Sequence, residues 1–257
     1  MMESSSIGFY KYLEKVLDDE TFSIINKISE RSNLYIFSGI IRNYFLGVEE
    51  IRDVDIVLEN EINIEKVFRR HKIKLNSFGG YKIQVGKTRI DLWYLKNTWA
   101  IKQHGSPFDL PLEQYIPYTA FFNFSAIVFS YNEMKFYCHK AFLSFLRDKR
   151  INYLYEPNAN STLCIVNTFY YSDKYQLKIA NKLIRYVIKN HKSGGRDYEL
   201  IQKTHFGKIL YTKKDLDDKI INLSKSLERV QKEKRSRINA KRSTFEVPFP
   251  PWPLLLK

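Results

Sequence analysis

The stretch that decides the fold runs from Tyr35 to Glu59 and reads YIFSGIIRNYFLGVEEIRDVDIVLE. It ends in an apolar run in which two carboxylates, Asp53 and Asp55, are separated by one residue. Because successive side chains of a strand point to opposite faces, the two acids share one face, and Val54 and Ile56 share the other. Two carboxylates held side by side repel each other unless a cation lies between them. The pattern therefore favours a divalent metal site.

Upstream of the acids, Ser38 and Gly39 close an apolar strand and open a short predicted helix. A small turn at a helix N-terminus offers backbone N–H groups and the positive end of the helix dipole, which suits a phosphate. Ser38 is equally well explained as a helix N-cap. Arg42 can assist at a triphosphate or pair with Glu49 or Glu50. A phosphate turn beside metal-binding acids favours chemistry on a nucleotide.

A third acid, Asp91, lies in the second strand of a predicted hairpin, where it shares one face with Arg89. If this strand pairs with the strand of Asp53 and Asp55, three carboxylates converge at one edge of the sheet. Three carboxylates can hold two Mg²⁺ ions, one lowering the pKa of an attacking hydroxyl and one neutralising charge on a leaving pyrophosphate. The alternative is a simple ion pair of Asp91 with Arg89 or Lys87.

The composition indicates a folded, basic protein. Of the 257 residues, 44% are hydrophobic and 15% aromatic, which allows a large core and excludes a disordered chain. The formal net charge of +14 suits a polyanionic partner, although an AT-rich genome would produce the same surplus of lysine. Cys138 and Cys164 lack the spacing of a zinc site or a disulfide framework. Without a signal region or an apolar run that spans a bilayer, we expect a soluble, cytoplasmic protein.

The order of the predicted elements indicates an α+β fold. We expect a small mixed, antiparallel-rich sheet with flanking helices, followed by a helical neck and C-terminal region. The expected parts are N-terminal helices packed on the head (1–32), the head domain (33–150), a helical basic domain (151–242) and a Pro-rich tail (243–257). Within them, the patterns predict a helix over 61–72, a strand over 119–129 and a helix over 175–192.

Two basic stretches lie in the second half of the chain. The predicted helix over 175–192 carries a stripe of five basic residues at steps of four, three, four and three: Lys178, Lys182, Arg185, Lys189 and Lys192. The segment 229–242 repeats the theme with seven basic residues and one acid. Both stretches can be solvated helix faces. The absence of balancing acids in the stripe favours contact with the phosphate backbone of RNA.

These motifs resemble, in order and spacing, the head domain of class II CCA-adding enzymes and bacterial poly(A) polymerases, members of the DNA polymerase beta nucleotidyltransferase superfamily. The resemblance extends over roughly residues 30–150. Its motifs are Ser38-Gly39, Arg42-Asn43, Phe45-Leu46-Gly47, Asp53-Val54-Asp55 and, resembling the family's Phe-Gly-Thr turn, Ser77-Phe78-Gly79-Gly80.

The chain also departs from the family pattern. Its turn is Ser-Gly rather than Gly-Gly, and Asn43 replaces the acid of the family's Arg-Asp pair. Ala120 and Phe121 lie near the positions of an Arg-Arg-Asp element that helps to hold the incoming nucleotide in the family. No convincing base-reading Glu-Asp-x-x-Arg motif is present in the neck. These departures favour a divergent nucleotidyltransferase with another acceptor over an enzyme of CCA synthesis.

The resemblance implies a metal-dependent enzyme that transfers a nucleoside monophosphate from an NTP to an acceptor hydroxyl and releases pyrophosphate. The expected site comprises Asp53, Asp55 and Asp91 as catalytic ligands of two Mg²⁺ ions, with Mn²⁺ as the alternative, and Ser38, Gly39 and Arg42 as nucleotide-binding residues. RNA, such as a tRNA 3′ end, is the preferred acceptor, and no membrane partner is expected. Two alternatives stay open: nucleotidylation of a protein, as in toxin–antitoxin or defence systems, and a non-catalytic RNA-binding relative.

Overall fold

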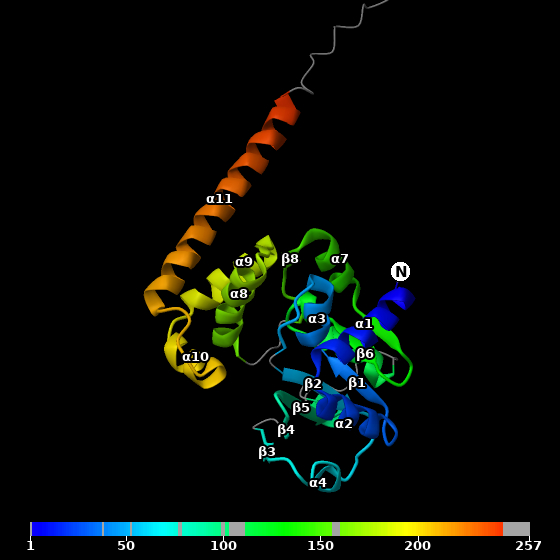
Figure 1. The fold of residues 1–257 in the computed structure, drawn as a ribbon. Helices are drawn as coiled ribbons and strands as arrows, with labels where there is room; N and C mark the ends of the chain where they lie inside the picture. Colours follow the sequence, from blue (N-terminus) through cyan, green and yellow to red (C-terminus); the bar gives the residue numbers. More distant parts are fainter. Residues whose placement is uncertain are drawn as a thin grey trace, which may run out of the picture. The chain divides into compact units, whose positions relative to one another are not determined.

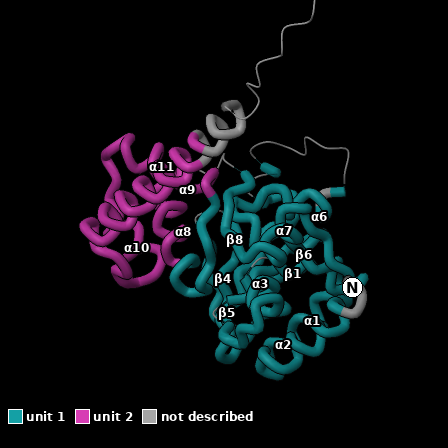
Figure 2. Tube along the Cα trace, turned by 90° about the horizontal axis from the view of Figure 1, so that it is seen from above, with its two compact units in different colours: residues 1–159, 171–180 teal, residues 160–170, 181–257 magenta. Residues whose placement is uncertain are grey.

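The structure is a computed structural model that describes residues 2–37, 39–51, 53–76, 79–98, 101–102, 111–155 and 160–243. Ser38, the Ser77-Phe78 pair and the tail from residue 244 onward lie outside the described residues. The chain divides into two compact units (Figure 2), residues 1–159 with 171–180 and residues 160–170 with 181–257. Helix α8 (Ser161–Tyr175) contributes to both units, because the division falls within it.

The first unit is built on a sheet whose described strands follow the order β3-β4-β5-β2-β1-β6-β7 (Figure 1). The strands are β1 (Leu34–Phe37), β2 (Asp53–Leu58), β3 (Ile73–Leu75), β4 (Tyr81–Val85), β5 (Thr88–Tyr94), β6 (Ile127–Ser130) and β7 (Lys135–Cys138). Neighbours are antiparallel except β2 and β5, which run parallel. This confirms the predicted mixed, antiparallel-rich sheet of an α+β fold.

Helices cover one face of this sheet. They are α1 (Met2–Val16), α2 (Asp19–Ser29) and α3 (Gly39–Leu46) (Figure 1). Phe9 of α1 packs against Phe129 of β6, with ring centroids 4.9 Å apart. Val54 and Ile56 of β2 are fully buried on this face. The predicted alternation along β2 is therefore observed, and Asp53 and Asp55 project from the opposite face.

The face that carries the acids is covered at one end by apolar residues. A short helix, α6 (Leu112–Tyr115), and the 3₁₀ turns η1 (Leu95–Asn97) and η2 (Ile116–Thr119) lie over the sheet there. The two turns contribute Leu95 and Ile116 to a small cluster of buried residues that also contains Tyr35, Val57 and Val128. Val57 of β2 belongs to this cluster. Asp53 and Asp55, which precede it on the same face of the strand, are only half-buried.

Two predicted elements of the first unit are wrong in extent. The helix predicted over 61–72 is a single turn, α4 (Ile64–Val67), because Phe68 leaves the helical region at φ −105° and ψ 27° and buries its ring. The strand predicted over 119–129 begins only at Ile127, since η2 and η3 (Asn123–Ser125) precede it. The Asn123 side chain bonds to backbone groups of residues 150 and 152, which holds this segment in a compact conformation.

The helix predicted over 175–192 is interrupted. Gln176 takes a left-handed conformation with φ 52°, so α8 ends at Tyr175. The chain then forms β9 (Lys178–Ile179), which pairs in parallel with β8 (Arg150–Ile151) after α7 (Lys140–Asp148). A new helix, α9 (Asn181–Lys192), begins only after this pairing. Backbone bonding to β8 thus overrides the helical pattern of this segment.

The second unit is helical. Besides the first part of α8 and α9, it contains α10 (Tyr198–Phe206) and α11 (Lys213–Ser243). Gln202, fully buried, binds the loop before α11 by accepting from the backbone N–H of residues 210 and 211. Burial raises the pKa of the Cys164 thiol to about 12, as expected of a core cysteine. None of the helices described is long and apolar enough for a membrane span.

Asp18 ties the turn between α1 and α2 to the β4–β5 hairpin. Its carboxylate accepts from the backbone N–H and the hydroxyl of Thr21, both at 2.9 Å, and from the Thr88 hydroxyl at 3.1 Å. Gly86 permits this approach: its φ is 50°, and a Cβ there would lie 2.7 Å from Asp18 Oδ1. Burial by itself raises the pKa of Asp18, but the hydrogen bonds together lower this pKa by more. The pKa of Asp18 therefore lies below its usual value.

We expect Asp18→Ala to lower the free energy of unfolding by about 1 kcal/mol, the usual cost of a lost N-cap, in urea denaturation. Because the folded-state pKa is lowered, the ionised carboxylate stabilises the fold above about pH 4 and loses this effect as the pH falls through the folded-state pKa. Between about pH 7 and pH 3, the wild type should therefore lose more stability than Asp18→Asn, which keeps a neutral cap. Equal losses would contradict this role of the carboxylate.

Candidate active site

Strands β2 and β5 bring the three predicted acids to one face of the sheet. In their parallel register, Asp55 is the Cα partner of Asp91, and Asp53 is the partner of Arg89. Paired residues of neighbouring strands project from the same face, and the strands are about 5 Å apart. Asp91 is buried, and Asp53 and Asp55 are half-buried. The expected pairing of the two acid-bearing strands is observed, and it places two carboxylates side by side.

Asp53 forms an ion pair with Arg89, whose Nη2 donates to Asp53 Oδ2. The Asp53 side chain is only 16% exposed, and the Arg89 side chain is 38% exposed. The sequence offered Arg89 as an alternative partner of Asp91, but the observed pair is with Asp53. Alternation along β5 places Arg89 and Asp91 on one face. The register with β2, which the sequence does not specify, decides which acid each one meets.

The neighbouring strands add two basic residues that the sequence analysis missed. Lys82 of β4 is the Cα partner of Asp91, and Lys74 of β3 is the partner of Lys82. Both lysines are exposed. A row of two lysines followed by Asp91 and Asp55 therefore crosses four strands on one face. The alternation of polar and apolar residues in β4 was the signal that could have placed Lys82 there.

Gly39 and Arg42 follow the end of β1 that lies beside the acids of β2. Because β1 runs antiparallel to β2, its end meets the start of β2, and Phe37 is the Cα partner of Asp55. Gly39 is the first residue of α3 and follows two positions later. A Cβ on Gly39 would lie 3.8 Å from Arg42 Nη2. Gly39 and the guanidinium are thus brought together, whereas Ser38 lies outside the described residues.

Arg42 is enclosed by aromatic rings and is only 7% exposed. Its guanidinium carbon lies 5.2 Å from the ring centroid of Phe124, 5.0 Å from that of Tyr171 and 4.8 Å from that of Tyr175. Nη2 donates to the Tyr175 hydroxyl at 2.8 Å, and Nε and Nη2 donate to Asn43 Oδ1 at 3.3 and 3.1 Å. The ring faces and neutral acceptors stabilise a buried cation. We call these four residues around Arg42 the arginine cage.

Asn43 replaces the acid of the family's Arg-Asp pair and has partners at both ends of its amide. Its Oδ1 belongs to the arginine cage, and its Nδ2 donates to the backbone oxygen of Glu50 at 2.7 Å. The glutamates that the sequence offered as partners of the caged arginine instead pair with lysines. Glu49 lies 2.5 Å from Lys15, and Glu50 lies 2.9 Å from Lys174. The Arg42 guanidinium is thus held by ring faces, the Tyr175 hydroxyl and the neutral amide of Asn43.

The acids suit a hard divalent cation in kind, since Mg²⁺ and Mn²⁺ prefer carboxylate oxygens. Over the described ranges, however, no three side chains of Asp, Glu, His or Cys come together in a metal-binding group. The strand register explains this: Asp55 and Asp91 are paired with each other, whereas Asp53 is paired with Arg89. The two facing carboxylates fit one divalent cation. The third carboxylate is occupied by a guanidinium.

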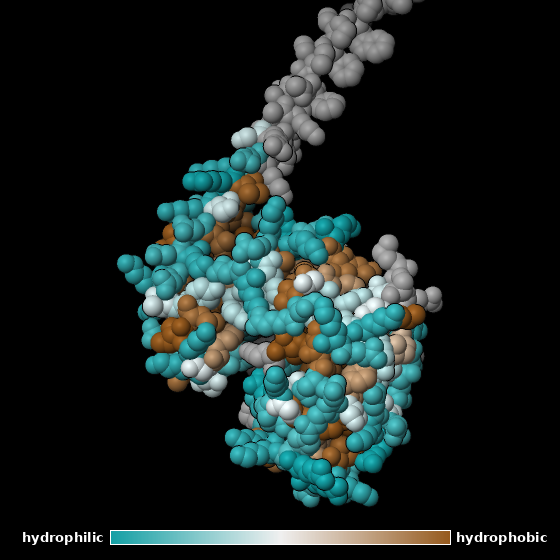
Figure 3. All heavy atoms as spheres, in the orientation of Figure 1, coloured by the Kyte–Doolittle hydropathy of each residue, from teal (hydrophilic) through white to brown (hydrophobic). Residues whose placement is uncertain are grey.

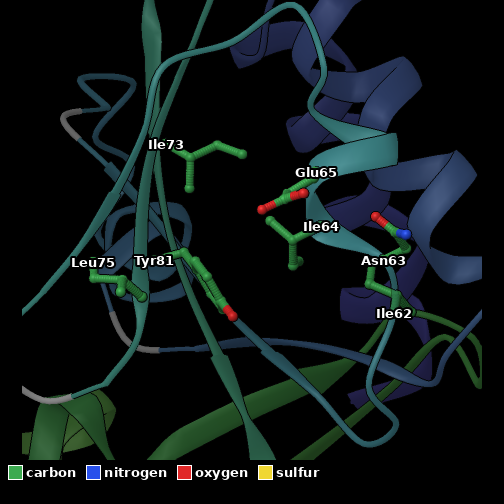
Figure 4. Close-up of a pocket in the computed structure, with 7 residues that line it drawn as sticks. All are labelled: Ile62, Asn63, Ile64, Glu65, Ile73, Leu75 and Tyr81. Atoms are coloured by element: carbon green, nitrogen blue, oxygen red, sulfur yellow. The ribbon is translucent and has the colours of Figure 1, made fainter.

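A pocket of about 600 Å³ lies apart from these residues, between α4 and strands β3 and β4 (Figure 4). It is lined by Ile62, Asn63, Ile64, Glu65, Ile73, Leu75 and Tyr81. Tyr81 is the Cα partner of Leu92, so it projects from the face opposite to Asp91. The lining offers one carboxylate and no basic side chain. Such a pocket does not suit a triphosphate, and the chemistry points to the other face.

Four of the five residues predicted as a basic stripe lie on α9: Lys182, Arg185, Lys189 and Lys192. All four are exposed, opposite the buried Leu183, Ile184, Tyr186 and Val187. Lys178 lies in β9 of the first unit, so its inclusion in the stripe was wrong. Hydrophilic side chains cover much of the surface shown in Figure 3. We call the four exposed residues of α9 the basic stripe.

No protein-family model matches the chain, and no curated protein matches it in sequence. Solved structures match it in fold. A CCA-adding enzyme in complex with CTP has a TM-score of 0.60 at 14% identity, and the match covers 84% of this chain and 54% of that one. A Thermotoga maritima CCA-adding enzyme complexed with tRNA gives 0.54 at 14% identity, covering 84% and 53%. A tRNA-processing enzyme with CTP gives 0.53 at 16% identity, covering 81% and 56%.

These matches concern the fold. The chain spans about half the length of the solved structures it matches. At such low identities, the shared property is the arrangement of helices and strands, and it confirms the fold resemblance predicted from the motifs of residues 38–55. The substrates and partners of those proteins do not transfer with it.

Proposed function

We propose that the protein is a nucleotidyltransferase that moves a nucleoside monophosphate from an NTP to an acceptor hydroxyl. The observation that carries the proposal is the pairing of Asp55 with Asp91, at the edge of the sheet where Gly39 opens α3. An acid pair beside a helix N-terminus is suited to a triphosphate and its counter-cation. The fold shared with CCA-adding enzymes supports this reaction class.

In the proposed reaction, the acceptor oxygen attacks the α-phosphorus of the NTP, and the bond to the bridging oxygen of the β-phosphate breaks. The acceptor proton passes to Asp91, and pyrophosphate leaves with the bonding electrons. Gly39 and the helix behind it hold the phosphates, and Arg42 and Lys82 offset their negative charge. A divalent cation held by Asp55 and Asp91 would neutralise charge on the transferred phosphate when bound. The chain's own part is positioning and charge neutralisation, which suffice for phosphoryl chemistry.

We propose RNA as the acceptor, and the basic stripe on α9 supports this. Its four cations are exposed on one face of a helix whose opposite face is buried. Similar proteins of known structure include a CCA-adding enzyme complexed with tRNA and another in complex with CTP. A tRNA-like 3′ end is the acceptor that this likeness favours. The loss of charge near Ala120 and Phe121, both buried, points to a substrate other than that of CCA synthesis.

Substituting alanine for Lys182, Arg185 and Lys189 together should weaken RNA binding by about tenfold or more near physiological ionic strength, because three phosphate contacts are lost. The slope of log K against log salt concentration should fall by about 2 for a single-stranded RNA. Fluorescence anisotropy with a labelled single-stranded RNA measures both quantities. The matched control is a triple variant of the first unit in which alanine replaces the exposed residues Lys11, Lys27 and Arg31. Equal losses in the two triple variants would argue against a specific role of the stripe.

The test of the proposed function is incubation of the protein with Mg²⁺, each α-labelled NTP and total cell extract, followed by sizing of the labelled product. We expect label in a species that ribonuclease destroys and protease does not. Label that survives ribonuclease but not protease would replace the RNA acceptor with a protein. Absence of any labelled product, together with tight and salt-sensitive RNA binding, would contradict catalysis and identify an RNA-binding relative.

A further inference from the structure

Trp93 lies on the face of the proposed active site, two residues after Asp91 on β5. Because side chains alternate along a strand, the two residues share this face, and their Cα atoms are about 7 Å apart. On the neighbouring strand β2, the Cα partner of Trp93 is Val57, which belongs to the buried cluster on the same face. The indole therefore lies between the acids and the apolar end of this face.

Gly80, the residue before β4, lies against one edge of the indole. It is buried although it has no side chain, and a Cβ there would collide with Nε1 and Cδ1 of Trp93. Two hydrogen bonds to Asn76 fix the Gly80 backbone. Its N–H donates to Asn76 Oδ1 at 2.9 Å, and its carbonyl oxygen accepts from the Asn76 backbone N–H at 2.8 Å. The indole edge thus rests on a backbone that is held in place.

Packing inside the protein does not account for the indole. Trp93 is only half-buried, and within the described ranges no aromatic ring stacks on it. The partly buried side chains that pack on the neighbouring cluster are Phe37, Ile101 and Tyr137. By contrast, Tyr81 of the same hairpin projects from the opposite face and has Tyr94 as a ring partner, with centroids 6.2 Å apart. Trp93 therefore has π surface left for a planar ligand.

The direction of the proposed reaction decides which planar group lies near Trp93. Strand β1 ends beside Asp55 and runs antiparallel to β2, so Gly39 follows toward the start of β2, and the pyrophosphate lies on that side of the acids. Trp93 lies further along β5, on the other side. The attacking and leaving oxygens of this chemistry are roughly in line, so the acceptor hydroxyl approaches from the side opposite to the pyrophosphate. The nucleoside at the acceptor end is therefore nearest to Trp93.

We propose that Trp93 is the stacking platform for an unpaired 3′-terminal base of the RNA acceptor and thereby holds the terminal hydroxyl beside Asp91. The inference rests on the proposed function, because it concerns the acceptor of that reaction. Stacking is an apolar contact, so it displaces no partner of Asp91 or of Lys82, its Cα partner on β4. All four bases have a π-face, so the platform positions the RNA end without reading its sequence. This suits a chain without a convincing base-reading motif in its neck.

The test is RNA binding by the full chain in the absence of NTP and Mg²⁺. Of the three tryptophans, Trp99→Phe and Trp252→Phe leave only Trp93 as a fluorophore. A single-stranded RNA should quench its fluorescence, and an RNA of the same length with an abasic 3′-terminal nucleoside should not. In the otherwise unchanged chain, Trp93→Ala should weaken RNA binding by about tenfold, and Trp93→Phe by no more than about threefold. The slope of log K against log salt concentration should stay the same, because no phosphate contact is lost.

Two comparisons show whether the base and the indole touch each other. Trp93→Ala and the abasic RNA remove the same contact, so the two changes together should weaken binding no more than either one alone. Tyr81→Ala is the matched control, since its ring belongs to the same hairpin but projects from the other face. It should leave RNA affinity within about twofold of the wild type. Circular dichroism of each variant verifies that a change in affinity comes from a folded chain.

Three results would overturn the inference. They are RNA binding by Trp93→Ala as tight as that of the wild type, additive losses from Trp93→Ala and the abasic end, and quenching of Trp93 by NTP alone. The last result would assign the platform to the incoming nucleotide. Labelled NMP transfer by the wild type, measured separately, shows whether the proposed function stands when this inference fails, because the binding test involves no transfer.

Discussion

Asp55→Asn should lower the rate of NMP transfer by at least about a thousandfold, which corresponds to about 4 kcal/mol of transition-state stabilisation. Asp55 is the Cα partner of Asp91. It lies beside the end of β1, where the chain leads into Gly39. The amide has the shape of the carboxylate but no charge. It therefore leaves Asp91 without the second anion that a divalent cation requires, while the strand pairing is kept.

The matched control is Asp148→Asn at the end of α7. Asp148 is a carboxylate that also has a close partner, since its Oδ1 lies 2.7 Å from Arg147 Nε, but it ends helix α7 and belongs to no strand of the sheet. Its amide should leave transfer within about twofold of the wild type, as expected of a surface ion pair. Initial rates with saturating NTP and RNA measure both variants. Transfer by Asp55→Asn at a tenth of the wild-type rate or faster would contradict an essential role of this carboxylate.

Arg42→Ala should lower the free energy of unfolding by about 3 kcal/mol. The substitution removes a 7% exposed guanidinium from between three rings and leaves a cavity in their midst. It also removes the donors that bind the Tyr175 hydroxyl and Asn43 Oδ1. Two of the rings come from the last turns of α8 and one from η3, so the loss weakens the packing between these segments, in which the rings of Phe124 and Tyr171 also contact each other with centroids 4.9 Å apart.

Equilibrium unfolding in urea, followed by tryptophan fluorescence, measures this effect. Arg31→Ala is the control, since Arg31 is exposed and its loss should cost less than about 0.5 kcal/mol. Arg42→Lys keeps the charge but not the planar fork, and should fall between the two variants. If Arg42→Ala unfolds at the same urea concentration as the wild type, the arginine cage contributes nothing to stability.

The local elements of the head could be predicted from the sequence because each has its own pattern. Alternation in residues 53–58 placed the acids on one face of β2, and Gly39 opens α3 directly after β1, as predicted. The same alternation put Arg89 and Asp91 together on β5. The pattern does not contain the direction or register of one strand relative to another, because these depend on the whole sheet. The partner of each acid therefore came only from the structure.

The arginine cage could not be predicted from the sequence, and the reason is a different one. Arg42 lies more than a hundred residues before Tyr171 and Tyr175, and no local pattern connects them. A pair of tyrosines four apart marks one face of a helix but does not say what faces it. Lys178 was placed on α9 because the basic spacing continued through it. Gln176, at φ 52°, and the pairing of β9 with β8 removed it from that helix, and both depend on the fold around them.

The most direct test of nucleotidyl transfer uses one NTP labelled either at the α-phosphate or at the γ-phosphate. With the wild type, we predict that the α-label enters RNA and that the γ-label is recovered entirely as pyrophosphate. With Asp55→Asn, neither label should move. Appearance of the γ-label in the RNA would show phosphoryl rather than nucleotidyl transfer. That result, or equal incorporation of the α-label by wild type and Asp55→Asn, would contradict the role assigned to the Asp55–Asp91 pair.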